Sequence, residues 1–452
     1  MQHINNNFAQ GSIASHIWRL SVPMTIAQLI NILYNIIDRV FIGRLPEDST
    51  NALTGLGIAF PICTLTIAFA NLVGTGGGPL FSIERGKGDD KEAEQILGNS
   101  FILLIITGII IGIGVSLIKT PLLYLFGASD ATFGYAYDYI SIYLMGTVFV
   151  MLSLGLNYFI NAQGFAKIGM ATVSIGAVCN VILDPIFIFG LDMGVKGAAY
   201  ATVISQFLSA VWTTSFLLGR RTEIKLKVSA FKLKADRVKK ILALGLSGFT
   251  MQITNGATQI VCNKMLSIHG GDAYIAAMTI INSVREVVTL GVTGVGSGTQ
   301  PVISYNYGAA KYDRVKYAIR LMAAVLLVYT TAAWLLVMVF SKQLVGFFNN
   351  DPSLLPIATS SMHIYFFGFF MMMFQFTGQT VFQALGKAKF AMFFSMLRKV
   401  IIVIPLTCLL PLIPAIGVNG VFLAEPVSNF IGGLACFMTM YILVYKRLGK
   451  TA

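Results

Sequence analysis

The sequence predicts an all-α, polytopic membrane protein with 12 transmembrane helices in two parallel six-helix repeats. Three observations lead to this prediction: the composition is strongly apolar, apolar runs of membrane-spanning length recur along the chain, and spaced residue patterns of the first half return in the second. Of the 452 residues, 56% are hydrophobic and only 11% are charged, whereas a soluble domain carries roughly 25% charged residues. The bilayer is therefore the solvent for most of the chain.

The apolar runs are long enough to cross a bilayer as helices. Phe101 to Ile118, Leu321 to Phe340 and Val421 to Val444 are examples, and about 20 helical residues span the ~30 Å hydrocarbon core. We expect spans at approximately residues 17-42, 53-83, 97-118, 137-160, 168-190, 197-218, 241-266, 275-303, 321-340, 362-382, 392-412 and 418-444.

A repeated spacing of small residues and proline divides these spans into two related halves. The shift between matching residues is about 222 to 224, a period that indicates an internal duplication. The matches include Gly76, Pro79, Ser82 and Gly86 with Gly298, Pro301, Ser304 and Gly308; Gly164 with Gly386; Gly194 and Gly197 with Gly417 and Gly420; and Asn31 with Asn255. Each half holds an even number of spans, so the repeats should be parallel.

The halves give a simple division of the chain. We expect a cytoplasmic N-terminal segment at 1-16, a six-helix bundle at 17-219, a basic linker at 220-240, a second bundle at 241-445 and a tail at 446-452. The first 16 residues lack the basic start, apolar core and cleavage site of a secretory signal. All five cysteines lie inside apolar spans, so we expect small buried side chains and no disulfide or zinc site.

The basic residues predict how the chain is oriented. Loops after even-numbered spans, with the C-terminal tail, hold 22 Lys or Arg, and loops after odd-numbered spans hold five. Cytoplasmic loops carry such an excess, so we expect a multi-pass protein of the bacterial plasma membrane with both termini in the cytoplasm. The net charge of +13 then reflects topology and contact with anionic lipid, and no nucleic-acid partner is expected.

Ionisable residues inside membrane spans are costly to bury, so each is a candidate for function. In the first span, Asn31, Tyr34, Asn35 and Asp38 stand at positions i, i+3, i+4 and i+7. They therefore share one helix face, which must turn away from lipid.

The fifth span has a similar polar face. Asn180 and Asp184 are four residues apart and share one side of a helix, just before Pro185. We expect the faces of the first and fifth spans to meet. Two carboxylates in one dry pocket can hold a proton between them, and the same oxygens can instead hold Na⁺, with Asn157, Asn180 and Thr202 as neutral ligands.

The second half carries two further acids in apolar surroundings, Glu286 and Glu425. Glu286 adjoins Arg285, and Glu425 precedes Pro426 with no charged neighbour in sequence. Both are candidates for substrate contact, and Glu425 also for proton transfer. Arg398 and Lys399 are expected near the cytoplasmic end of the eleventh span, where long basic side chains snorkel outward.

Several short motifs, in order and in both halves, resemble the multidrug and toxic compound extrusion (MATE) transporters. The resemblance covers roughly residues 13 to 445. The matching stretches are Tyr34-Asn35-Ile36-Ile37-Asp38 with Phe41-Ile42-Gly43, Asn180-Val181-Ile182-Leu183-Asp184-Pro185, Gly194-Val195-Lys196-Gly197-Ala198-Ala199, Gln300-Pro301, Tyr305-Asn306-Tyr307-Gly308-Ala309 and Gln383-Ala384-Leu385-Gly386.

The resemblance implies a cation-coupling site in the first half. Asp38, Asn180 and Asp184 match its motif and would be the metal ligands if the ion is Na⁺; Asn157, Thr202 and a tyrosine of the fourth span, Tyr139 or Tyr143, match less closely. We assign Asn31, Tyr34, Asn35, Glu286 and Glu425 to substrate binding. Sodium-coupled relatives often have a glutamate in the seventh span, where this chain has Gln252 and Asn255, which favours H⁺.

The functional prediction is a secondary antiporter that exports amphipathic, often cationic drugs or metabolites in exchange for H⁺ or Na⁺. It needs no cofactor, and we expect it to work as a monomer. One alternative is a flippase for lipid-linked precursors, which should have a large cationic cavity; another is a channel or sensor. Enzyme function is not expected: Gly74 to Gly78 lacks the Lys and Ser/Thr of a phosphate-binding loop.

Overall fold

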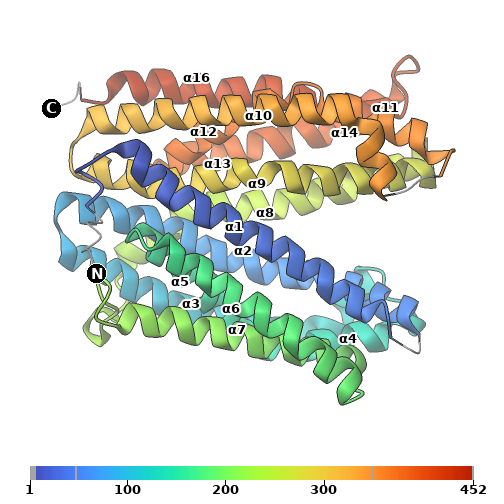
Figure 1. Ribbon diagram of the computed structural model, residues 1–452, viewed down its shortest axis with the longest axis horizontal. Coiled ribbons are helices and arrows are strands. Elements are labelled where there is room, and N and C mark those ends of the chain that lie inside the picture. The colour runs from blue at the N-terminus through green and yellow to red at the C-terminus, as the bar shows by residue number, and fades with distance from the viewer. Residues whose placement is uncertain (1–6, 46–47, 349–350, 450–452) are drawn as a thin grey trace. The chain divides into compact units, whose positions relative to one another are not determined.

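The computed structural model describes residues 7–45, 48–348 and 351–449, and within them it is helical without a β-strand (Figure 1). In the first half the helices are α1 (Ile13–Ile42), α2 (Ser49–Lys87), α3 (Asp90–Leu125), α4 (Asp130–Met145), α5 (Thr147–Ala162), α6 (Ala166–Pro185), the π-helix η1 (Ile186–Gly190) and α7 (Gly194–Leu218).

The second half follows a short 3₁₀ turn, η2 (Val228–Ala230). Its elements are α8 (Ala235–His269), α9 (Asp272–Gly308), α10 (Tyr312–Phe348), α11 (Leu354–Phe366), η3 (Phe369–Met371), α12 (Met372–Ala384), α13 (Ala388–Met396), the π-helix η4 (Leu397–Val403), α14 (Ile404–Leu409), η5 (Leu410–Leu412), α15 (Asn419–Ser428), the π-helix η6 (Asn429–Gly433), α16 (Leu434–Leu443) and η7 (Tyr445–Arg447).

The number of apolar helices agrees with the predicted twelve spans. Among the described residues, 10 helical segments are long and apolar enough to cross a membrane, and the pair α4 and α5, bent by 59°, makes up to 11. Helix α8 is more polar, but its 35 residues extend about 52 Å at ~1.5 Å per residue. With α8, the count is consistent with twelve.

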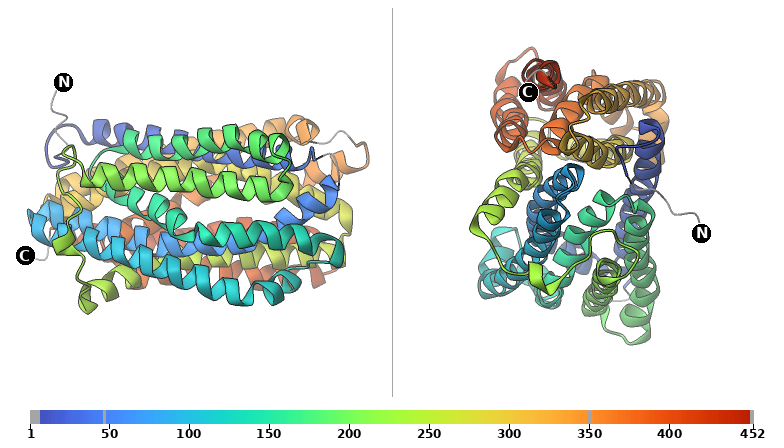
Figure 2. Two further views of the ribbon diagram at one scale, coloured as in Figure 1. Left: turned by 90° about the horizontal axis from the view of Figure 1, so that it is seen from below. Right: turned by 90° about the vertical axis from the view of Figure 1, so that its left-hand side faces the viewer.

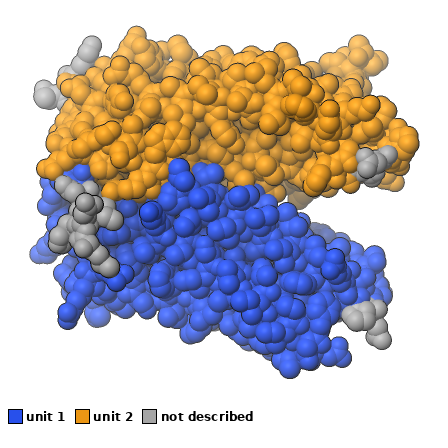
Figure 3. Space-filling view, in the orientation of Figure 1, with its two compact units in different colours: residues 1–7, 22–249 blue, residues 8–21, 250–452 orange. Residues whose placement is uncertain are grey.

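The helices pack into two compact units, which Figure 3 colours separately. One contains residues 22–249 and the other residues 8–21 and 250–449. Both α1 and α8 cross from one unit to the other, so each begins in one unit and ends in the other. Within each unit the long helices run roughly along a common direction (Figure 2), as expected for spans that cross the same bilayer.

The duplication is visible in the backbone as well as in the sequence. A left-handed conformation, with positive φ, occurs at pairs of positions about 222 residues apart, as a repeat predicts. The pairs are Asp48 with Gly271, Gly88 with Ala310, Gly164 with Gly386 and Gly194 with Gly417. The break in the fourth span also recurs: Gly146 separates α4 from α5, and Gly368 stands at the break before η3 and α12.

The basic stretch 220–240 packs against the N-terminal part of α3. Asn99, fully buried, donates to the carbonyls of Ala230 and Lys232 at 3.0 Å each and accepts from the backbone N–H of Lys234 at 3.0 Å. Arg237 makes two 2.7 Å bonds to the carboxylate of Glu92. Backbone hydrogen bonding to a buried amide fixes the path of this segment.

Helices α2 and α8 approach closely within the first unit, and glycine permits this. A Cβ atom at Gly245 would lie 1.6 Å from the carbonyl oxygen of Leu72, and one at Gly76 would lie 2.0 Å from the carbonyl oxygen of Ile241. Small residues let membrane helices approach to backbone contact. No side chain larger than hydrogen fits at either position without moving a helix.

We therefore expect Gly245→Ala to destabilise the protein. Alanine improves helix propensity by roughly 1 kcal/mol, but overpacking against rigid backbone costs about 1–3 kcal/mol or more, so the net change is a loss of stability. The measurement is the Tm of the purified protein in detergent, which should fall by several degrees. Gly114→Ala is the matched control, because a Cβ there has nothing within 4 Å. An equal or higher Tm for Gly245→Ala would contradict this packing.

The predicted orientation can be tested at Lys232, whose side chain is exposed. The excess of basic residues in even-numbered loops predicts that this segment is cytoplasmic. A single cysteine placed there by Lys232→Cys should react with a membrane-impermeant maleimide only after the cells are permeabilised. Asp130→Cys, exposed at the start of α4 just after the third span, is the opposite control and should react in intact cells.

Candidate functional site

A pair of aspartates lies inside the first unit. Asp38 is near the end of α1, and Asp184 is in the last turn of α6, where Pro185 precedes the π-helical turn η1. Asp38 is 9% exposed and Asp184 is fully buried. The two side chains lie within hydrogen-bonding reach of each other. The polar faces predicted for the first and fifth spans therefore meet.

The aspartate pair has no ion-pair partner among the described residues, although Arg39 adjoins Asp38. Arg39 is exposed and lies over the ring of Phe60. Asn180 donates to one oxygen of Asp184 at 3.2 Å. Within the described part of the chain, Asp38 Oδ1, Asp184 Oδ2 and Asn180 Oδ1 are buried without a hydrogen-bond donor.

Three buried oxygens without a hydrogen-bond partner lie in this cluster. Each buried acceptor without a donor costs about 1–3 kcal/mol, and two carboxylates side by side add charge repulsion. A shared proton removes the repulsion by converting one carboxylate into a donor. A bound Na⁺ satisfies the same oxygens as ligands.

Tyrosines and small polar groups surround the aspartates. Tyr34 lies close to both carboxylates, and the hydroxyl of Tyr139 is within hydrogen-bonding reach of Thr202 on α7. Tyr143 has Cys63 and Thr66 of α2 as its hydrogen-bonding neighbours. The N-unit polar cluster thus comprises Tyr34, Asp38, Cys63, Tyr139, Tyr143, Asn180, Asp184 and Thr202.

Asn157, Asn35 and Asn31, which the sequence also assigned to the site, make hydrogen bonds away from the aspartates. Asn157 donates to the carbonyl of Gly169 at 3.2 Å; Gly169 is near the start of α6, about 16 Å along the helix axis from Asn180 at ~1.5 Å per residue. The structure therefore does not bring Asn157 to the aspartates. Asn35 donates to the carbonyl of Asn31 at 2.7 Å, a bond to its own helix that leaves its oxygen for other partners.

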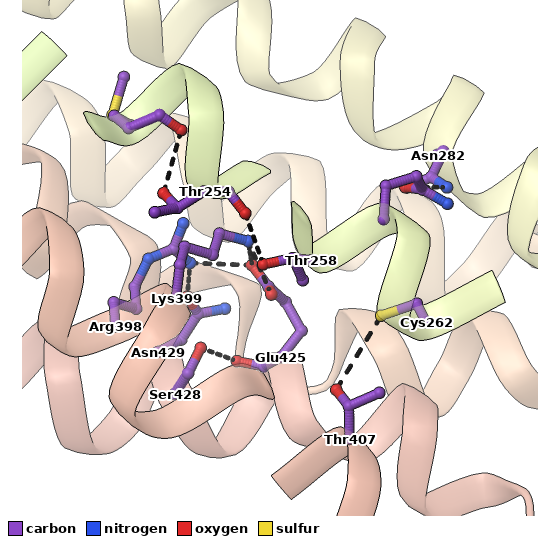
Figure 4. Close-up of polar contacts among 12 residues, drawn as sticks. Thr254, Thr258, Cys262, Asn282, Arg398, Lys399, Thr407, Glu425, Ser428 and Asn429 are labelled. Carbon is purple, nitrogen blue, oxygen red and sulfur yellow. Dashed lines mark hydrogen bonds and ion pairs between the residues drawn. The ribbon is translucent and has the colours of Figure 1, made fainter. Parts of the chain in front are cut away.

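In the second unit, a buried glutamate is paired with basic side chains. Glu425 of α15 is 7% exposed and Lys399 of η4 is 3% exposed. The Lys399 ammonium lies 3.1 and 3.0 Å from the two Glu425 oxygens, and Arg398 Nη1 lies 2.8 Å from one of them (Figure 4). Arg398 also donates to Asn429 at 3.0 Å. The expectation that Arg398 and Lys399 snorkel outward is wrong, because both pair with the buried carboxylate of Glu425 on α15.

A small cavity adjoins this ion cluster. Its polar lining includes Lys399 and Glu425 together with Arg285 of α9, whose neighbours are the Tyr365 hydroxyl and, at longer range, Glu425. The adjacent Glu286 is exposed and is not among the lining residues. On α9, therefore, the arginine reaches the cavity and the glutamate does not.

Equivalent positions of the two repeats contact each other in both units. At the shifts of about 222 to 224 residues, Cys262 and Thr407 are the counterparts of Asp38 and Asp184. Cys262 Sγ lies 3.9 Å from Thr407 Oγ1 (Figure 4). The helix pairing is thus conserved within the molecule, while a pair of acids in one unit is replaced by a thiol and a hydroxyl in the other.

Comparison with known proteins identifies the family that has this architecture. The MatE family model matches residues 23–186 and 248–409, one stretch in each half. The chain belongs to the MATE family. It is 27% identical over 438 residues to the multidrug export protein MepA of Staphylococcus saprophyticus, covering 96% of this chain and 95% of the relative. The protein of the same name from Staphylococcus haemolyticus is 28% identical over 427 residues, covering 94% of this chain and 93% of that one.

Solved MATE structures share the fold along the full length. A structure described as an outward-facing conformation of a multidrug resistance MATE family transporter has a TM-score of 0.92 at 22% identity and covers 100% of both chains. A MATE structure in a bent conformation has a TM-score of 0.93 at 22% identity and covers 100% of this chain and 99% of that one. The chain is therefore a transporter-family protein and not an enzyme.

Sequence reasoning missed part of the second-unit site. Arg285 and Tyr365 were not singled out as site residues, and the partners of Glu425 were sought among its sequence neighbours. One signal was present: Tyr365 stands at the repeat position of Tyr143, about 222 residues earlier. Mapping the second half onto the polar residues of the first would have directed attention to Tyr365.

Removing Glu425 should expose how strongly this MATE protein depends on its buried ion cluster. Glu425→Leu leaves Arg398 and Lys399 buried without their carboxylate, and breaking such a pair costs about 3–5 kcal/mol. Thermal unfolding in detergent should therefore occur at a clearly lower temperature. The double variant Glu425→Leu/Lys399→Met should recover part of the loss. If the stability loss of the double variant equals the sum of the losses in the two single variants, Glu425 and Lys399 are not coupled as described.

Proposed function

We propose that this MATE protein is a secondary active antiporter. It exports amphipathic, often cationic compounds in exchange for H⁺, or for Na⁺, by rocking its two bundles in alternating access. Two relatives of nearly full coverage are named multidrug export proteins, which supports the cargo class. The main support for ion coupling is the buried pair Asp38 and Asp184, which has no ion-pair partner among the described residues.

The proposed coupling follows from the electrostatics of that pair. Two close carboxylates repel each other in a low-dielectric interior, so binding one proton or one Na⁺ changes the packing preferred by α1 and α6. A cation that binds one arrangement better shifts the population toward it. Exported compound and cation then compete through one conformational equilibrium, and the coupling is reciprocal.

The second unit bears on the choice of ion. The chain has Gln252 and Asn255 on α8 in place of a seventh-span glutamate, and Glu425 is already paired with two cations. We therefore place cation coupling in the N-unit polar cluster. Protons are the favoured ion, because the chain lacks the seventh-span glutamate that sodium-coupled relatives often have.

One observation favours the flippase alternative. The second-unit cavity is lined by two basic side chains, Arg285 and Lys399, and one acid, Glu425. A lipid-linked precursor would bring a pyrophosphate to such a cavity. The relatives are named exporters, so drug export remains the first candidate.

Neutralising either aspartate should uncouple transport. Asp38→Asn and Asp184→Asn remove the charge that the cation balances while keeping nearly the same shape. In inverted membrane vesicles, gradient-driven uptake of a fluorescent cationic dye should fall at least tenfold for each variant. Proton and sodium gradients are imposed separately, and we expect the wild type to respond to the proton gradient.

Asp138→Asn is the matched control for this experiment. Asp138 lies on α4 and makes an exposed pair with Lys196 at 3.4 Å, so its loss should leave transport near the wild-type rate. Wild-type transport by Asp184→Asn under either gradient would reject the proposed coupling site. Uptake driven only by a sodium gradient would keep the site and change the ion.

A further inference from the structure

The cavity of the second unit has an unbalanced charge. Arg285, Arg398 and Lys399 contribute three cations to the cavity wall or to the ion cluster behind it, and Glu425 contributes one carboxylate. Among the described residues, no ion pair includes Arg285. An unpaired cation inside a membrane protein is expensive and marks a functional position.

We propose that this cavity binds the oxyanion of an amphipathic organic molecule, a carboxylate or a phosphate, with Arg285 as its principal contact. The inference concerns the cargo of the proposed transporter and so extends the proposed function. It does not depend on coupling to H⁺ or Na⁺, because binding to the cavity can be measured without any gradient.

The hydrogen bonds show why Arg285, unlike Arg398 and Lys399, can donate to a bound molecule. Lys399 is engaged with both oxygens of Glu425, at 3.1 and 3.0 Å, and Arg398 is engaged with Glu425 and Asn429. In the part of the chain that the structure describes, the Tyr365 hydroxyl is the hydrogen-bonding neighbour of Arg285, and Glu425 lies at longer range. A guanidinium has five N–H donors in a fixed fork, so Arg285 retains the geometry that binds a carboxylate or phosphate with two parallel bonds.

The rest of the lining fits an amphipathic molecule. Apolar contacts come from Met278, Val403 and Val421, and amides from Asn255, Gln259 and Asn282. Asn282 donates to Gln259 at 3.0 Å, and Gln259 donates to Asn263 at 2.9 Å, so these amides form a chain along the wall. A few convergent polar groups in a partly apolar pocket are typical of small-molecule sites.

The ion cluster beside the cavity also favours oxyanion binding. Glu425 holds Lys399 and Arg398 in place, and both basic residues lie on the π-helix η4. The wider turn of a π-helix often occurs at functional sites. Their two positive charges are only partly cancelled by one carboxylate, so the field at the cavity is positive even before Arg285 is counted.

A matched pair of dyes tests the proposal directly. Rhodamine 110 carries a free carboxylate, and rhodamine 123 is its methyl ester with the same fluorophore. Binding of each to the full-length protein is measured by fluorescence anisotropy in phosphatidylcholine nanodiscs, with protein-free nanodiscs as background. The variants are Arg285→Gln, Arg285→Lys and, as the charge-removal control, Lys342→Gln, whose lysine is exposed and is not a lining residue of the cavity.

The proposal predicts a loss specific to the carboxylate. Arg285→Gln should weaken rhodamine 110 binding at least tenfold and change rhodamine 123 binding less than twofold. Arg285→Lys, which keeps the charge but loses the guanidinium fork, should weaken rhodamine 110 binding to an intermediate degree, and Lys342→Gln should leave it unchanged. With the wild type, benzoate or phenyl phosphate should displace rhodamine 110, while neutral benzamide should not. Stronger displacement by phenyl phosphate identifies a phosphate site, and stronger displacement by benzoate a carboxylate site.

Other outcomes overturn the inference. Equal losses for both dyes in Arg285→Gln would mean that the arginine only supports the fold. Unchanged rhodamine 110 binding, or equal displacement by benzamide, would mean that no oxyanion is recognised. If Arg285→Gln does not fold, the competitor series on the wild type decides alone. Failure here leaves the coupling experiment at Asp38 and Asp184 untouched, because that experiment follows the transport of a cationic dye.

Discussion

A carboxylate inside a membrane must be neutralised, and this constraint organises both halves of the molecule. In the first unit, Asp38 and Asp184 lie side by side without an ion-pair partner among the described residues. In the second unit, Glu425 is held by Lys399 and Arg398. One unit therefore leaves its negative charge to be balanced from outside, and the other balances it internally.

The duplication explains how one fold carries both solutions. Positive-φ positions and the breaks at Gly146 and Gly368 recur in the two halves, so the helices that meet around one site meet again around the other. Only the side chains differ: Asp38 and Asp184 face each other in one unit, and Cys262 contacts Thr407 in the other. Backbone constraints are retained while the chemistry of the interior has diverged.

Much of this could be predicted from the sequence, and the reason is physical. Membrane spans follow from hydropathy and length alone, and the polar face ending at Asp38 has one direction that avoids lipid. The meeting of that face with Asp184 was predictable because both faces had to be buried. The bend of 59° between α4 and α5 was not predicted, although Gly146 stands at the break.

The second-unit site was harder to predict because its parts are distant in sequence. Glu425 has no charged neighbour along the chain, and its partners Arg398 and Lys399 were assigned to the membrane surface by a rule for long basic side chains. That rule assumes water as the nearest partner for the charge. A buried carboxylate on a packed helix is a competing partner, and only the tertiary structure reveals it. Asn157 is the reverse case: it matched the motif pattern, but it bonds to Gly169.

The contrast between the two units argues for a division of labour. Protonating Glu425 would weaken contacts of 2.8 to 3.1 Å to two cations, and leaving either cation unpaired in a membrane is costly. Its charge is therefore fixed, which suits a residue that positions others and does not suit a coupling acid. Asp38 and Asp184 have no such bonds to lose, so gaining a cation relieves repulsion and removes an unsatisfied acceptor. The first unit is thus suited to energy coupling, and the positive cavity of the second is suited to recognising part of the cargo.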